Sequence, residues 1–149
     1  MKTTRRLTLL LLGLGLAGCT NLEPSSDTRV EVQLQASPRN AGRIAQATLS
    51  AREAQTDLSA FVSGVPFGTT LPLRLAAFIY PGSCARLGAQ PAYVLNRTLV
   101  TTRIGPVDGW RLSRSAPVPL ASLRAAPYAL VLRTAPADGE VDLFCGDIP

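Results

Sequence analysis

The chain has 149 residues, of which 15 are Lys or Arg, 10 are Asp or Glu and none is histidine. This length corresponds to one domain with a sizeable core, and the arginines are scattered rather than clustered, which argues against nucleic acid as a partner. Without histidine, a Ser-His-Asp or Cys-His catalytic apparatus is excluded.

The N-terminus has the pattern of a secretory signal. Lys2, Arg5 and Arg6 precede an apolar run over residues 7–16, which is too short to cross a bilayer as a permanent helix. The sequence Leu16-Ala17-Gly18-Cys19 resembles the bacterial lipobox, in which the chain is cut before the cysteine and the sulfur is acylated. We therefore predict a signal peptide over residues 1–18 and a lipid anchor on Cys19. The alternative is an ordinary signal peptide with a chance cysteine.

The segment after Cys19 reads as a tether. Residues 20–27 are polar and contain one proline, so we expect residues 19–28 to link the lipid to a domain over residues 29–149. Removal of the signal leaves 12 basic and 10 acidic residues, because three basic residues lie within it. Thr20 rather than aspartate follows Cys19. By the same resemblance, this favours the outer membrane, facing the periplasm.

Alternation of apolar and polar residues predicts short strands along the rest of the chain. Residues 92–95 and 99–103 are read as short strands or an ordered loop, and residues 120–124 as one helical turn. Short strands separated by proline and glycine indicate an antiparallel sandwich or barrel. The predicted strands cover residues 29–36, 45–52, 57–63, 73–80, 110–115, 128–133 and 140–145.

The two other cysteines, Cys84 and Cys145, would be exported together with the domain. In an oxidising compartment a disulfide is the expected state, and two buried free thiols are the alternative. Closing a loop of about 60 residues would stabilise the fold by roughly 4 kcal/mol in the chain-entropy model.

Four segments in order resemble the copper/zinc superoxide dismutase-like fold, above all its small bacterial members and CHRD domains. They are Gly64-Val65-Pro66, the run from Phe78-Ile79-Tyr80 to Cys84, Pro127 to Arg133, and Cys145-Gly146-Asp147-Ile148. The resemblance implies an all-β, antiparallel Greek-key β-sandwich of about seven or eight strands. It also implies a disulfide between the loop after the first metal-binding strand and the final strand, where Cys84 and Cys145 stand.

The metal-binding positions of that family depart from its pattern. Its His-x-His corresponds to Phe78-Ile79-Tyr80, and a further histidine corresponds to Arg133. With no histidine, and with Met1 as the one methionine, the exported domain has no imidazole or thioether for copper or zinc. We therefore expect no metal and no cofactor. Phe78, Tyr80 and Arg133 either form a repurposed pocket for an anionic or planar ligand, or fill the space left by a lost metal.

Two smaller features each allow two interpretations. Asp138, Glu140 and Asp142 could form a weak calcium site or a carboxylate pair, with residues 140 and 142 on one strand face, or a solvated face beside a turn. Trp110 either projects from a loop to bind a partner or plugs the end of the sandwich.

Together these observations favour a non-catalytic, metal-free envelope lipoprotein that serves as a binding or structural module. Its expected partners are the membrane, through the lipid anchor, and an envelope protein or small ligand. The alternative is a degenerate enzyme, either a remnant dismutase or a hydrolase that uses carboxylates.

Overall fold

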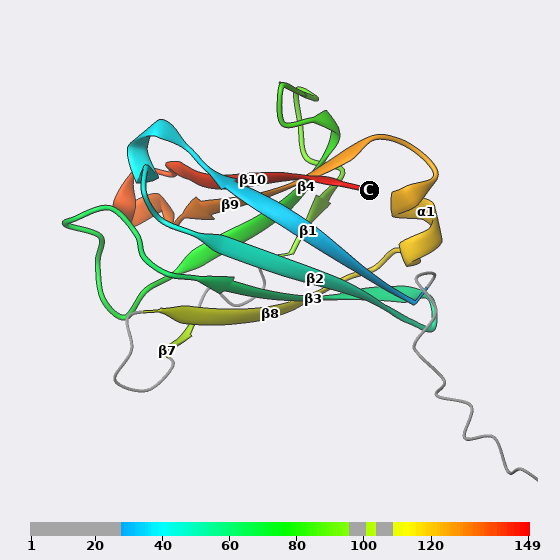
Figure 1. Ribbon diagram of the computed structural model, residues 1–149, viewed down its shortest axis with the longest axis horizontal. Coiled ribbons are helices and arrows are strands. Elements are labelled where there is room, and N and C mark those ends of the chain that lie inside the picture. Colours follow the sequence, from blue (N-terminus) through cyan, green and yellow to red (C-terminus); the bar gives the residue numbers. More distant parts are fainter. Residues whose placement is uncertain (1–27, 96–100, 104–108) are drawn as a thin grey trace, which may run out of the picture.

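A computed structural model of the chain describes residues 28–95, 101–103 and 109–149 (Figure 1). The predicted signal peptide, Cys19 and residues 20–27 lie outside these residues, as does part of the 99–103 segment. Seven strands of seven to nine residues make up about half of the described chain: β1 (Arg29–Ala36), β2 (Ala45–Arg52), β3 (Gln55–Val62), β4 (Leu75–Ser83), β8 (Trp110–Ala116), β9 (Tyr128–Thr134) and β10 (Asp142–Ile148). The shorter elements are β5 (Arg86–Leu87), β6 (Tyr93–Val94), β7 (Thr102–Arg103), α1 (Leu120–Arg124) and the 3-10 turns η1 (Pro38–Asn40) and η2 (Pro136–Asp138).

The strands form two packed layers that meet along one seam. The N-terminal sheet has the order β1-β2-β3-β8-β7, and the C-terminal sheet has the order β5-β4-β9-β10, with β6 beside β4. Every paired strand is antiparallel, and β1 joins β10 through two residue pairs, Gln35 with Cys145 and Ala36 with Phe144. The chain crosses to the C-terminal sheet after β3, returns to the N-terminal sheet between β6 and β7, and crosses again, through α1, after β8, as Greek-key connections do. The predicted all-β antiparallel sandwich is confirmed.

Alternating side chains fill the space between the sheets. In β1 each second residue is buried, and Val32 has no exposed surface. The opposite sheet contributes Ile79, Leu130 and Leu132 to the same core, and Leu123 of α1 packs at one end of it. The half-buried Trp110 packs against the same core. The structure therefore supports the interpretation that Trp110 plugs the end of the sandwich.

Several predicted strand boundaries are off by one to three residues, and two of these differences have identifiable backbone reasons. The strand expected to end before Pro81-Gly82 continues to Ser83, because Gly82 adopts a φ of 94° and the chain pairs onward with β5. The last strand begins at Asp142 and not at residue 140. Glu140 has a left-handed φ of 52°, which places it in the turn after η2.

The seam needs a glycine at one point of β10. A Cβ atom on Gly146 would lie 2.5 Å from the carbonyl oxygen of Gln33 and 2.7 Å from Cγ1 of Val32. Both atoms belong to β1, so the missing side chain lets β1 pass across β10. The close approach joins the two sheets into one curled structure.

Candidate functional site

The positions that the resemblance relates to metal ligands lie on the outer face of the C-terminal sheet. Leu75, Ala77 and Ile79 of β4 point into the core, so Phe78 and Tyr80 point outward. Residue 76 of β4 pairs with Arg133 of β9, which sets Arg133 on the same outer face. The structure therefore brings the three predicted pocket residues together, as the sequence analysis expected.

The guanidinium of Arg133 lies over both aromatic rings. Its Cζ atom is 4.8 Å from the ring centroid of Phe78 and 6.0 Å from that of Tyr80, and the two rings are 6.2 Å apart. These distances allow cation–π attraction, which is strongest for a partly desolvated cation. The Arg133 side chain is 22% exposed. Its planar group therefore covers the rings instead of leaving a cavity above them.

Hydrogen bonds fix the guanidinium in this position. Nε of Arg133 donates to Oδ1 of Asp142 at 2.6 Å, and Nη2 donates to the hydroxyl oxygen of Tyr80 at 3.2 Å. Asp142 lies directly opposite Arg133 in the β9–β10 ladder. The bond to Asp142 raises the pKa of Arg133, burial opposes this effect, and the bond to Tyr80 adds to it. The protein's own groups thus engage two of the N–H donors of this cation and hold its plane in a fixed orientation.

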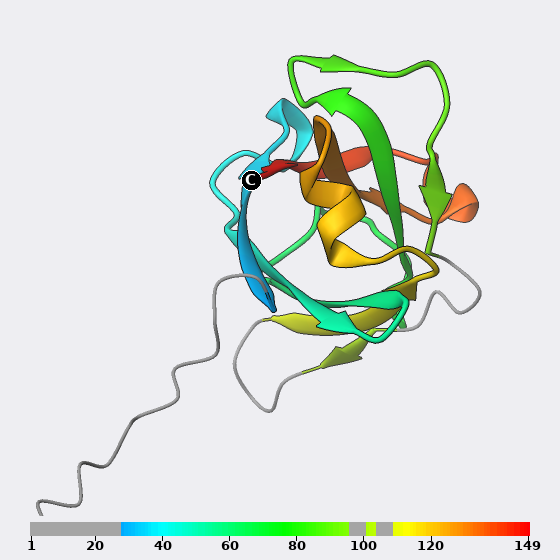
Figure 2. The ribbon, with the colours of Figure 1, turned by 90° about the vertical axis from the view of Figure 1, so that its right-hand side faces the viewer.

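A disulfide bridges the same outer face. Cys84 follows β4 and is bonded to Cys145 of β10, with Cα atoms 5.8 Å apart, so the predicted disulfide is confirmed. Because β9 lies between β4 and β10, the bridge passes over it, and Ala129 and Val131 of β9 are buried although they point outward. The backbone N–H of Cys84 also donates to Asp147. Figure 2 shows the segment after β4, in yellow-green, arching beyond this sheet before it returns as β6.

These residues do not fit a copper or zinc ion. Copper and catalytic zinc need neutral imidazole, thiolate or thioether donors, and the three positions carry two aromatic rings and a cation. In the part of the chain that the structure describes, no three His, Cys, Asp or Glu side chains gather at a point where they could hold a metal.

The three C-terminal carboxylates flagged in the sequence are engaged separately. Asp142 binds Arg133, Glu140 is exposed in a turn, and Asp138 accepts a hydrogen bond from the backbone N–H of Thr70 at 2.9 Å. The Thr70 bond lowers the pKa of Asp138. Glu140 lies outside β10, so residues 140 and 142 do not share a strand face as predicted. Asp138 instead attaches the 66–70 loop to η2.

A second outer face, on the N-terminal sheet, was not singled out from the sequence. Ladder pairing aligns its outward residues in three rows of four, and none of the twelve is fully buried. We call these positions the polar face, because eleven of them are polar or charged and the other is Phe61. The rows are Gln33, Gln46, Phe61 and Arg111; Glu31, Thr48, Ser59 and Ser113; and Arg29, Ser50, Asp57 and Ser115.

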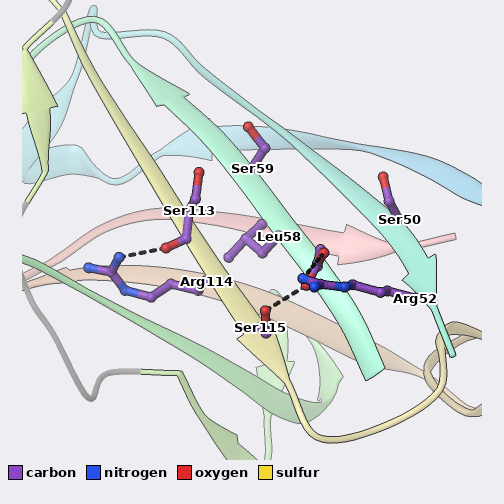
Figure 3. A pocket seen from close by; sticks show the side chains of 8 residues that line it. Ser50, Arg52, Leu58, Ser59, Ser113, Arg114 and Ser115 are labelled. Atoms are coloured by element: carbon purple, nitrogen blue, oxygen red, sulfur yellow. Dashed lines mark hydrogen bonds and ion pairs between the residues drawn. The ribbon is translucent and has the colours of Figure 1, made fainter. Parts of the chain in front are cut away.

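A shallow hollow of about 490 Å³ lies over one end of the polar face. Figure 3 shows Ser50, Ser59 and Ser113 projecting from three neighbouring strands to one side of the sheet. At the border of the hollow, Nη1 of Arg52 donates to Asp57 at 3.2 Å. Alternation in the sequence shows each of these residues to be outward-facing. Their alignment into rows depends on strand register, which the alternation does not reveal.

Comparison with known proteins found no match for this chain. The chain matches no protein-family model, no curated protein and no solved structure. Within the described ranges no helix is long and apolar enough to cross a membrane, and α1 has five residues.

The packing of Arg133 predicts a structural cost when it is replaced. Arg133→Met keeps a long apolar stem but removes the ring contact and the bond to Asp142. We expect the free energy of unfolding to fall by about 1–2 kcal/mol in urea denaturation. The free energy of unfolding of Arg133→Lys should lie between those of the unchanged protein and Arg133→Met, because lysine keeps the charge but loses the planar fork. The matched control is Arg111→Met on the exposed face of β8, which should change stability little. Equal stabilities of all four proteins would contradict a space-filling role.

The Asp138–Thr70 bond predicts a pH-dependent contribution to stability. A carboxylate whose pKa is lowered by folding stabilises the native state above its ordinary pKa, and the effect is lost as pH falls through the folded-state value. Asp138→Asn should therefore lower the melting temperature slightly at about pH 7, with a difference that narrows toward about pH 2. Glu140→Gln is the neighbouring control. A difference for Asp138→Asn that does not vary with pH would refute this assignment.

Proposed function

We propose that this protein is a non-catalytic, metal-free lipoprotein of the bacterial cell envelope, with a superoxide dismutase-like sandwich as a binding or structural module. The observation that carries the proposal is the Arg133 guanidinium, which lies against Phe78 and binds Asp142 where the resembled enzymes hold metal. The strand order and the disulfide from the end of β4 to β10 agree with that scaffold.

The enzymatic alternatives find less support in the same residues. A remnant dismutase needs a redox metal, and the outer face of the C-terminal sheet presents a cation and two rings in place of ligands. A hydrolase built on paired carboxylates needs two acids at one point, whereas Asp138 and Asp142 bind different partners.

The placement of the first described residues agrees with a tethered domain. The described chain begins at Thr28, and β1 starts at the end of the sandwich where α1 and the C-terminus lie (Figure 1). We propose that the lipid on Cys19 anchors the protein to the outer membrane, facing the periplasm.

The anchor can be tested by replacing the acylated residue. Cys19→Ala should abolish incorporation of labelled palmitate, because the acceptor sulfur is gone, and should leave the signal uncut, because the lipobox ends at this cysteine. Thr20→Ser, one residue further on, is the control and should be labelled and cut like the unchanged protein. Palmitate incorporation that persists in Cys19→Ala would rule out this anchor.

The metal-free state can be tested on protein purified from the native envelope. A ligand that binds the native state alone must raise the melting temperature. We expect added Cu²⁺ or Zn²⁺ to leave that temperature unchanged and superoxide dismutase activity to be absent with either metal. A metal-dependent rise, together with nitrogen or sulfur in the inner coordination sphere, would overturn the proposal.

A further inference from the structure

The polar face of the N-terminal sheet has the chemistry of a ligand surface. We propose that it binds an extended, neutral oligosaccharide, which lies across β1, β2, β3 and β8. This inference rests on the proposed binding function and names the class of ligand.

The shape of the face favours an elongated ligand. The 490 Å³ hollow shares Ser59 with a second hollow of about 210 Å³, and the second shares Gln46 and Phe61 with a third of about 440 Å³. The three hollows therefore lie next to one another across the sheet, and we call this row of hollows the groove. Its floor is low where small serine side chains stand in adjacent strands, and its borders are the taller side chains of Arg52 and Arg111.

Strand stability alone does not account for this composition. Exposed strand positions usually carry threonine, β-branched or aromatic residues, which pack well on a pleated surface. Here Ser59 and Ser113 face each other in β3 and β8, and Ser115 faces Asp57. Each hydroxyl can donate one hydrogen bond and accept two, which suits a ligand covered with hydroxyl groups.

The carboxylates of the polar face are already paired within it. Glu31 accepts hydrogen bonds from Thr48 at 2.9 Å and from Gln46 at 3.1 Å. Asp57 accepts from Arg52 and from the hydroxyl of Ser115. These contacts hold the polar groups in place before a ligand arrives, which lowers the entropic cost of binding. Arg52 offsets the charge of Asp57, whereas the partners of Glu31 are neutral hydrogen-bond donors.

Other classes of ligand match the face less well. The centre of a protein–protein interface is apolar and aromatic, whereas Phe61 is the single ring among the twelve positions and is half-buried. Nucleic acid and anionic lipid surfaces require a cluster of cations. Here Arg29 and Arg111 lie on the two outermost strands of the face, β1 and β8, and Arg52 is bound to Asp57. A sugar chain can form hydrogen bonds with the hydroxyls and amides of the face, and an apolar sugar face can pack against its one ring.

The experiment is a titration of the envelope-purified protein, labelled with ¹⁵N, with chitohexaose and with cellohexaose, two extended neutral sugars. We expect at least one of them to shift backbone amide signals of β2, β3 and β8, while signals of β9 and β10 stay in place. Shifts confined to other elements, or no shifts with either sugar at millimolar concentration, would overturn the inference.

Two variants with matched controls separate binding from folding. Phe61→Ala should weaken the affinity about tenfold through loss of the ring contact, and Phe67→Ala, at a fully exposed position in the 63–74 loop, should not. Ser59→Leu should abolish binding by filling the groove, whereas Ser122→Leu, at an exposed position of α1, should leave binding intact. Equal binding by Phe61→Ala, Ser59→Leu and their controls would also refute the site. Failure of binding leaves the metal-free proposal standing, because metal addition tests that separately.

Discussion

A guanidinium that is largely removed from water must find partners within the protein, and this requirement organises the outer face of the C-terminal sheet. Arg133 meets it with Asp142 across the β9–β10 ladder, with the hydroxyl of Tyr80, and with the ring of Phe78. Phe78 and Tyr80 belong to β4 and Asp142 to β10, so the contact ties β4, β9 and β10 together, and the disulfide also joins the end of β4 to β10. A guanidinium held in this way supplies no lone pair for a metal, because it has only N–H donors.

The two outer faces of the sandwich therefore differ in exposure. On the C-terminal sheet, Ala129 and Val131 are buried on the face that carries the disulfide and Arg133, so that this face extends the core. On the N-terminal sheet, serine, threonine and glutamine side chains remain accessible, and their hydrogen bonds run within the face. The scaffold thus closes one outer face and leaves the other open to solvent.

The candidate site could be predicted only in part. The resemblance named Phe78, Tyr80 and Arg133, and the structure places them in contact. The role of Asp142 escaped the sequence analysis, which grouped it with Asp138 and Glu140 because of their closeness along the chain. Glu140 instead adopts a left-handed backbone conformation, and β10 starts two residues later. That conformation separates the acids, and neither spacing nor composition signals it.

By itself, the sequence determined which residues form strands and which side chains point inward, because a period of two is a local property of an extended chain. It also determined the absence of imidazole chemistry, since composition does not depend on folding. Tertiary structure alone decided which strands are neighbours, and so which outward residues share a row. The alignment of Ser59 with Ser113, and of Asp142 with Arg133, comes from pairing between segments distant in the chain. Register of that kind depends on turns and packing across the whole sandwich.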